Sequence, residues 1–476
     1  MGHSVSGGSI VKNPTVASSE RIPLGVKIAY GGAEGSVTTV WTAFAVYFLF
    51  FLTEVVGISA SVGGMVLGVA VLWDAVTDPA MGIISDRTHS RYGRRRPYII
   101  ASAVPFCVTF WLLFSTPPLH GFLRVAYFVL MAVLMHTAMT VLSVPHAALV
   151  PEMTTDYDER TSLASYRFAW SVIGSLFSAV LLLLIANRFE DRTVGWSVAA
   201  AVVGFLCLFP ILLTWRYTRG WERYSESSEI MNIRDMRDAI FGNRSLRYAL
   251  CIFIFGITAN YAGGSIAVYF LEYWMGFSKE QISLYWLIFF VSNLLWVPVI
   301  LYLSYRMGKR GAYIICIGIG AITYGVGNIM VQPGQVLVMY VLSVIGALAA
   351  AATYQLLWAM IPDVVEVDEF KTGKRREGLY YGVYLLTTKL ASALALFIVG
   401  QVLEFIGYIP NIEQPHSVLL GIRLLFGPGV GGLLLISAVI TIFFPMTRKR
   451  HKALLKAIEA KRTGVPWNEG EFKELL

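Results

Sequence analysis

Charged residues are scarce in this chain. Asp, Glu, Lys and Arg make up only 14% of its 476 residues, whereas 56% of the residues are hydrophobic. Soluble domains usually carry about 25% charged residues. Together with a mean hydropathy of +0.63, this composition excludes an ordinary soluble domain and indicates a membrane protein with many spanning helices.

Cysteines are also few, and familiar catalytic motifs are missing. The four cysteines fall within apolar stretches, with no disulfide or metal spacing; they are Cys107, Cys207, Cys251 and Cys316. The sequence has no HExxH motif and no Walker loop, which argues against a membrane enzyme and against an ATP-driven pump. We therefore expect neither an enzyme activity nor a resident cofactor.

Long apolar runs, in contrast, recur along the chain. About twelve of them reach the roughly 20 residues that a spanning helix requires. Lys and Arg gather in alternate connecting loops, so the net charge of +8 does not indicate a nucleic-acid partner. Because positively charged loops stay on the cytoplasmic side, the pattern predicts a multi-pass protein of the cell (inner) membrane with both termini in the cytoplasm.

The chain divides into two similar halves. The longest internal polar stretch covers residues 216–247, and the sequence ALVPE at 148–152 is echoed by AMIPD at 359–363. Repeated halves of this kind are the architecture of major-facilitator transporters. We therefore predict an all-α membrane fold with twelve transmembrane helices in two pseudo-symmetric six-helix bundles. The predicted parts are a cytoplasmic N-terminal tail, a first bundle, a cytoplasmic central loop, a second bundle and a cytoplasmic C-terminal tail, at residues 1–26, 27–216, 217–245, 246–446 and 447–476. For the C-terminal tail, a soluble amphipathic segment is the default interpretation.

Two aspartates lie inside an apolar run, in the motif WDAVTDP at residues 73–79. Asp74 and Asp78 are one helical turn apart, so both carboxylates lie on one face of a helix. A charged carboxylate in a bilayer costs on the order of 2.5–3.5 kcal/mol, and a bound cation is the natural compensation. The alternative is that both carboxylates pair with basic groups of neighbouring helices and only hold the bundle together.

Nearby hydroxyl groups complete a predicted cation site. Thr77 lies between the two aspartates. Thr140, in the fourth apolar run, shares a helix face with Ser143 and offers an oxygen ligand to a hard cation. The predicted cation-binding residues are Asp74, Asp78, Thr77 and Thr140.

Ionisable residues also fall inside other apolar runs. Lys389 lies about ten residues into the eleventh run, where it must pair with a carboxylate, face a cavity or lose its proton. Arg167 lies near the start of the fifth run. It either has a functional role between the helices or extends its side chain to the membrane surface. Glu34 is either embedded in the first run or located at the cytoplasmic interface. The predicted substrate-binding residues are Arg167, Lys389, Ser143, Trp170, Tyr354, Trp358 and Tyr166.

The loop after the second run holds a predicted gate. Asp86 can pair with arginines across the interface between the halves, and such pairs must break for the gate to open. The alternative is that the arginines only anchor the loop on the cytoplasmic side. The predicted gating residues are Asp86, Arg87, Arg94 and Arg95.

Four motifs together resemble the glycoside–pentoside–hexuronide:cation symporter (melibiose permease-like) family of the major facilitator superfamily. They are WDAVTDP at 73–79, RYGRRRP at 91–97, VP through LVP at 144–151, and DVVE through DEFK at 363–371. The resemblance implies cation-coupled solute transport, with a sodium, lithium or hydrogen ion bound by Asp74, Asp78 and Thr140. It also implies that Arg167 and Lys389 link the cation site, the substrate and the two halves.

The chain departs from this family at the sugar site. The two aspartates that hold sugar hydroxyls in melibiose permease correspond here to Val37 and Ser143, and two tryptophans correspond to Ala147 and Tyr354. A serine is a weaker partner for vicinal hydroxyls than a carboxylate. The usual galactoside site is therefore absent, and the sequence leaves open another glycoside, an acidic sugar or a more apolar solute.

The sequence thus predicts a secondary active transporter. It would move a sugar or glycoside-type solute together with Na⁺ or H⁺ by alternating access, as a monomer in the lipid bilayer. One alternative is a cation-coupled transporter of a more apolar or amphipathic, lysolipid-like solute. The other is a transporter-shaped sensor that binds a ligand without moving it.

Overall fold

The computed structural model describes residues 21–154, 156–221, 233–374 and 376–463, together with residues 472 and 475. Every regular element within these residues is helical. Eleven helical stretches among them are long and apolar enough to cross a membrane. The all-α membrane architecture predicted from the composition is therefore confirmed.

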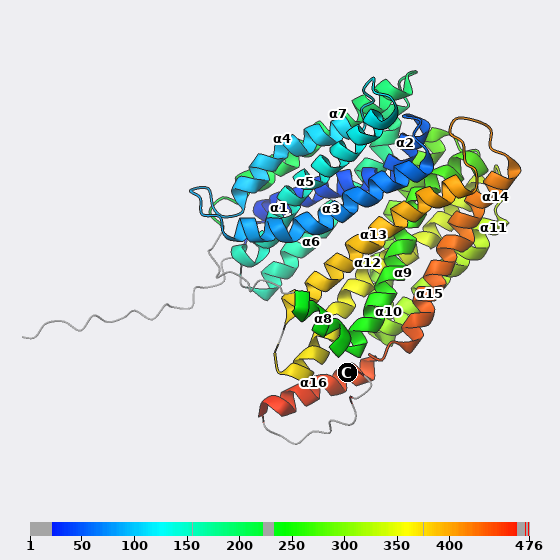
Figure 1. The fold of residues 1–476 in the computed structure, drawn as a ribbon. Helices are drawn as coiled ribbons and strands as arrows, with labels where there is room; N and C mark the ends of the chain where they lie inside the picture. The colour runs from blue at the N-terminus through cyan, green and yellow to red at the C-terminus, as the bar shows by residue number, and fades with distance from the viewer. Residues whose placement is uncertain are drawn as a thin grey trace, which may run out of the picture.

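The helices form two bundles (Figure 1). The first bundle contains α1 (Leu24–Ala43), η1 (Phe44–Phe48), α2 (Leu49–Glu54), α3 (Ala60–Asp86), α4 (Arg96–Leu113), α5 (Gly121–Met153), α6 (Tyr157–Ala186) and α7 (Arg192–Tyr217). The second bundle contains α9 (Arg244–Tyr269), η2 (Phe270–Trp274), α10 (Lys279–Ile322), η3 (Thr323–Gly327), α11 (Asn328–Met330), α12 (Val336–Thr372), α13 (Glu377–Phe405), α14 (His416–Leu424), η4 (Leu425–Gly429) and α15 (Val430–Phe443). Two further helices, α8 (Ile233–Gly242) and α16 (Arg448–Thr463), lie outside the two bundles. Each η segment is a π-helical turn that continues into the neighbouring helix, so α1, η1 and α2 form one span.

The stretch Lys279–Met330 crosses the membrane twice. Its 52 residues would measure about 78 Å as one straight helix, whereas a hydrocarbon core is roughly 30 Å thick. Gly308 breaks the stretch, with φ 82° and ψ 162°, a conformation that glycine adopts without a steric penalty. Counting the two sides of this break separately gives the twelve predicted crossings within the described residues, six in each bundle.

Close helix packing joins the two bundles along α3 and α13. A Cβ atom added to Gly400 of α13 would lie 2.4 Å from the Ala60 carbonyl oxygen and 2.7 Å from the Gly64 Cα of α3. Small residues at such a crossing allow two backbones to touch. These two glycines therefore set the distance between the halves at this crossing.

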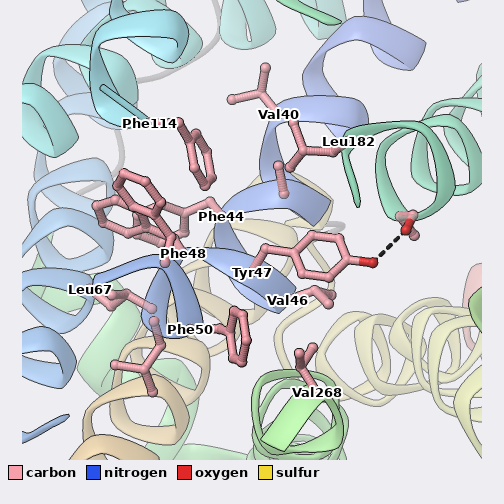
Figure 2. Packing of buried hydrophobic residues seen from close by; sticks show 14 of the residues in the cluster. Val40, Phe44, Val46, Tyr47, Phe48, Phe50, Leu67, Phe114, Leu182 and Val268 are labelled. Atoms are coloured by element: carbon pink, nitrogen blue, oxygen red, sulfur yellow. Dashed lines mark hydrogen bonds between the residues drawn. The ribbon is translucent and has the colours of Figure 1, made fainter. Parts of the chain in front are cut away.

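An aromatic cluster fills the interior near η1 (Figure 2). Phe44 and Phe48 stack with ring centroids 5.3 Å apart, and Phe114, the residue directly after α4, packs edge-on against Phe48. Tyr47 donates a hydrogen bond to the carbonyl of Ala179 in α6. Because aromatic side chains bury a large apolar area in a fixed geometry, this cluster holds η1 firmly against α4 and α6.

The two bundles approach each other at one end and diverge at the other (Figure 1). They meet toward the end that carries α2 and α14, which we call the opposite face. They diverge toward the end that carries α8 and α16, which we call the terminal face. The two segments that the sequence assigns to a central loop and a C-terminal tail each contain a helix. The central loop contains the helix α8, and the C-terminal tail forms α16, which packs against α10 and α12.

Candidate functional site

Charged and hydroxyl side chains from three helices converge between the bundles. Asp74 and Asp78 come from α3, Thr140 from α5 and Lys389 from α13. Lys389 forms ion pairs with both carboxylates: its Nζ contacts Asp74 and lies 2.9 Å from Asp78 Oδ2. The Thr140 hydroxyl lies 2.7 Å from Asp74 Oδ1 and 2.9 Å from Asp78 Oδ1, and its single proton can be donated to either.

The net charge of this polar cluster suits one added cation. Asp74 is fully buried and Asp78 is half-buried, and Lys389 supplies one positive charge against their two negative charges. In the alternative interpretation of the sequence, basic groups neutralise both acids. Lys389 pairs with both carboxylates but supplies only one of the two positive charges required. A monovalent cation or a proton balances the remaining charge, and carboxylate and hydroxyl oxygens are suitable ligands for a hard ion.

Two further residues border the cluster. Thr77 places its hydroxyl 3.3 Å from that of Thr140. His136 of α5 is fully buried, its Nδ1 lies 3.7 Å from Asp74 Oδ2, and neither ring nitrogen has a hydrogen-bond partner within the described residues. The ring packs edge-on against Trp41 of α1, with centroids 5.7 Å apart. Trp41 therefore connects the cluster to the cavity described next.

A cavity of about 670 Å³ lies between the bundles. Its wall is built from both halves, namely α1, η1 and α6 of the first bundle and α9, α10, η3, α12 and α15 of the second. The polar and aromatic part of the wall includes Thr38, Trp41, Ser171, Ser175, Asn260, Tyr261, Asn293, Tyr354, Gln355 and Trp358. Across the interface, Trp41 Nε1 donates to the Tyr261 hydroxyl at 3.1 Å. Within the described part of the chain, the wall of this cavity contains no ionised side chain.

The predicted substrate residues divide into two groups. Tyr354 and Trp358 line the cavity, whereas Ser143, Tyr166 and Trp170 are outside the lining found among the described residues. Trp170 instead packs into a glycine-rich face of α1. A Cβ added to Gly31 would lie 2.4 Å from Trp170 Cδ1, and one added to Gly35 would lie 2.8 Å from Trp170 Cε3. The ring therefore serves the packing of α6 on α1 in this conformation.

Arg167 is paired rather than directed into the cavity. Its Nε and Nη2 lie 3.0 and 2.5 Å from Glu34 Oε2 of α1. His146 of α5 lies 3.8 Å from the same carboxylate oxygen and stacks on Tyr30, with centroids 4.6 Å apart. Glu34 is thus a further acid in the first bundle, besides Asp74 and Asp78, and Arg167 is its ion-pair partner.

Several cavity residues were missed at the sequence level. Phe168, Ser171, Val172 and Ser175 of α6 line the cavity. Their spacing of three, four and seven residues places them on one helix face. That periodicity was readable in the sequence. It does not by itself distinguish a face that lines a cavity from a face that packs against another helix.

Residues 29–448 match the family model described as MFS/sugar transport protein. The chain belongs to this family of transporters. A Synechocystis symporter, itself described as uncharacterized, is 30% identical over 94% of this chain and 98% of its own length. A Salmonella typhimurium protein assigned as a sulfoquinovose importer is 28% identical, over 93% of this chain and 94% of its own. The Escherichia coli inner membrane symporter YicJ is 27% identical, over 85% and 87%.

Solved structures show the same fold at low sequence identity. A bacterial homologue of the human peptide transporters PepT1 and PepT2 superposes with a TM-score of 0.64 at 13% identity, over 91% of this chain and 99% of its own. A bacterial homologue of the transporter Spinster, solved in an inward-facing conformation, gives 0.65 at 12% identity, over 90% and 97%. This member of the MFS/sugar transport family is therefore a multi-pass membrane transporter and not an enzyme.

In this MFS protein, inter-bundle contacts close the opposite face. Glu54 of α2 accepts a hydrogen bond from Tyr408, and the Asn411 amide donates to the Glu54 carbonyl at 2.9 Å. The hydroxyls of Thr53 and Tyr269 lie 2.8 Å apart. These contacts join α2 to the second bundle beyond the cavity, and they hold the transporter closed on this side.

The predicted gate lies on the terminal face, but its observed ion pair is within one half. Asp86 pairs with Arg95, and Arg94 Nη2 lies 2.5 Å from Glu152 Oε1 at the end of α5. The expected partner of Asp86 across the interface is therefore not the one found, because the bundles diverge on this face and Arg95 lies nine residues away in the same loop. Arg87 ends α3 as its C-cap residue.

The second half contains an ion pair equivalent to that of Arg94 and Glu152. Lys309 Nζ lies 2.5 Å from Asp363 Oδ1 and joins α10 to α12, as the pair of Arg94 and Glu152 joins the loop before α4 to α5. Glu152 and Asp363 are the last residues of the two echoed sequences ALVPE and AMIPD. The echo thus corresponds to equivalent ion pairs in the two pseudo-symmetric bundles.

Proposed function

We propose that this MFS protein is a secondary active symporter that couples a sodium ion or a proton to a neutral solute of the glycoside type. The observation that carries the proposal is the cluster of Asp74, Asp78, Thr140 and Lys389. It carries one uncompensated negative charge, and its ion pairs join α3 of the first half to α13 of the second. A cation bound there acts on the contact between the halves.

The coupling follows from competition for the carboxylates. A cation bound between Asp74 and Asp78 weakens their hold on Lys389, which belongs to the other half. The two bundles can then rearrange around the cavity, as in alternating access. Because linkage is reciprocal, a solute that favours the rearranged state also raises the affinity for the cation.

The cavity wall supports a neutral polar solute. Trp41, Tyr354 and Trp358 offer flat apolar surfaces that suit the C–H face of a sugar ring. Asn260 and Gln355 offer amide donors and acceptors for hydroxyl groups. A wall without ionised side chains disfavours an acidic sugar, and Arg167, which would bind such a solute, is held by Glu34.

An amphipathic, lysolipid-like solute is the second candidate. Most of the cavity wall is apolar and aromatic, and this favours a solute with a hydrocarbon part. A glycoside and a lysolipid differ in the length of the apolar chain that the cavity wall must cover. Transport measured with a panel of solutes of both kinds therefore distinguishes the two candidates.

The proposed orientation places the terminal face in the cytoplasm. Loops rich in Lys and Arg, such as the one that holds Arg94 and Arg95, lie on that face, as the positive-inside rule requires. With the opposite face closed by Glu54 and Tyr408, the conformation described here is then inward-facing. We propose that the protein acts in this orientation as a monomer.

Transport into proteoliposomes tests the proposed function. Labelled glycosides and lysolipids are offered under an imposed sodium gradient, an imposed pH gradient and no gradient. We expect one solute class to accumulate under one of the gradients, and Asp78→Asn to abolish the accumulation. Asp238→Asn removes an exposed carboxylate from α8 and serves as the matched control. Equilibration without accumulation indicates a facilitator, and binding without movement indicates a sensor; either result contradicts the proposal.

A further inference from the structure

A second cavity, of about 390 Å³, lies on the terminal face at the break in α10. Among the described residues, its lining contains no member of the cation cluster and comes from the second bundle, α16 and the segment between α15 and α16. The polar side chains that line it include Ser304, Lys309, Arg310, Asp363, Arg448, His451 and Lys452. Most of these groups are cationic, so the cavity is a concentration of positive charge.

The cavity retains positive charge after its ion pairs are counted. Lys309 is matched by Asp363 at 2.5 Å, and His451 lies 2.6 Å from Glu366. Arg310 donates to the carbonyl of Ile442, and Arg448 Nη1 donates to that of Tyr305 at 2.6 Å. Carbonyl acceptors are neutral, so these bonds orient the guanidinium groups without cancelling their charges. Lys452 is exposed and adds a third positive charge.

The fold brings these cations together through Gly308. This residue interrupts α10 with a positive φ of 82°, and a Cβ atom placed on it would lie 3.1 Å from Arg448 Cβ of α16. The missing side chain therefore leaves room for α16 to lie across the break. As a result, Arg310 on one element and Arg448 and Lys452 on the other border the same space.

An apolar wall continues from the basic cavity along the membrane-spanning helices. Leu301 and Tyr305 of α10 line the cavity and are 60% and 75% exposed. Phe443, at the end of α15, is 65% exposed. In a spanning helix, exposed apolar side chains face lipid. The cavity mouth thus joins a cationic end at the level of the headgroups to an apolar surface at the level of the acyl chains.

We propose that this cavity binds the phosphate group of an anionic phospholipid. The charges of Arg310, Arg448 and Lys452 match a phosphate, and guanidinium groups form charge-assisted hydrogen bonds with its oxygens. Basic pockets between helices on the cytoplasmic side are suited to anionic headgroups. The exposed side chains of Leu301, Tyr305 and Phe443 select a lipid over free phosphate, because only a lipid covers them. A bound lipid would bridge α10 and α16.

Thermal unfolding of the purified full-length protein in neutral detergent tests this proposal. The probes are dioctanoyl phosphatidylglycerol, dioctanoyl phosphatidylcholine and inorganic phosphate. We expect phosphatidylglycerol to raise the unfolding midpoint, with little effect of the other two. In Arg448→Gln and in Lys452→Gln, the concentration of phosphatidylglycerol required should rise about fivefold for each charge lost, since a basic residue near an anionic surface contributes about 1 kcal/mol.

Matched variants separate this site from general charge effects. Lys449→Gln with Lys456→Gln removes two charges from the same helix, at exposed positions outside the cavity lining found in the described residues. This pair should leave the response unchanged. If Lys452→Gln, which keeps the Arg448 contact with α10, responds like the wild type, the proposal is overturned. A response to inorganic phosphate as strong as that to the lipid also overturns it, in favour of a site for free phosphate.

Discussion

Lys389 of α13 forms an ion pair with Asp74 of α3, and this pair connects the two halves of the transporter at the fully buried end of the cation cluster. The ammonium group occupies space between two carboxylates that a sodium ion or a proton could also neutralise. Lys389 is therefore a tethered competitor of the coupling cation, as well as a contact between the bundles.

Replacing Lys389 with Met tests this competition. The variant leaves Asp74 and Asp78 without their basic partner, and breaking a buried ion pair by removing one member costs about 3–5 kcal/mol. We expect a lower unfolding midpoint without added cation and a larger rise on adding NaCl at constant ionic strength or on lowering the pH. Thermal unfolding measures both, with Lys449→Met on the exposed side of α16 as the control. A response to cations equal to that of the wild type would exclude the competition.

Gly400→Ala should separate the two halves. The added methyl group would lie 2.4 Å from the Ala60 carbonyl oxygen, so α13 must move away from α3. Overpacking of this kind costs about 1–3 kcal/mol. Gly432→Ala of α15 meets nothing within 4 Å and should be neutral or stabilising, because alanine is the better helix former. Comparable midpoints for the two variants would show that the α3–α13 crossing does not depend on this contact.

His451 should make the docking of α16 depend on pH. The hydrogen bond to Glu366 raises the pKa of His451 above its usual value of 6.5, with burial acting against it and Asp363 adding to it. A raised pKa in the folded state means that the stabilisation is complete below about pH 6.5 and is lost as the pH rises through the raised value. We expect proteolysis within α16 to accelerate as the pH rises, and we expect His451→Gln to remove this dependence. A pH-independent wild type would contradict the prediction.

The sequence predicts the membrane crossings more completely than it predicts the cation cluster. The twelve crossings follow from apolar runs and loop charge, which are local properties of the chain. Asp74, Asp78 and Lys389 stand out because an ionisable residue inside an apolar run is rare and costly. Their convergence, however, depends on α3 and α13 crossing at Gly64 and Gly400, which is a tertiary contact that periodicity does not reveal.

Other features depend on partners that the sequence does not identify. Trp170 is of a residue type that often binds solutes, but it packs on Gly31 and Gly35. The sequence does not distinguish these roles, because an aromatic side chain suits a pocket and a helix contact equally well. For the C-terminal segment, the sequence favours a soluble amphipathic tail and indicates no docking partner. In the structure, Phe472 packs on Phe370 at 5.1 Å between centroids, and the Leu475 carbonyl accepts a hydrogen bond from Ser245. The apolar face of an amphipathic helix can be read from its sequence. The surface against which that face packs cannot.

The most direct measurement is the cation dependence of thermal stability in the wild type and in Asp74→Asn. A ligand that binds only the native state raises the unfolding midpoint by mass action. We predict a rise with NaCl that KCl and choline chloride do not produce, or a rise on acidification if the ion is a proton. Either rise should be lost in Asp74→Asn and retained in the control Asp238→Asn. A wild type that responds to neither ion, or an Asp74→Asn variant that responds fully, would contradict a coupling site at this carboxylate.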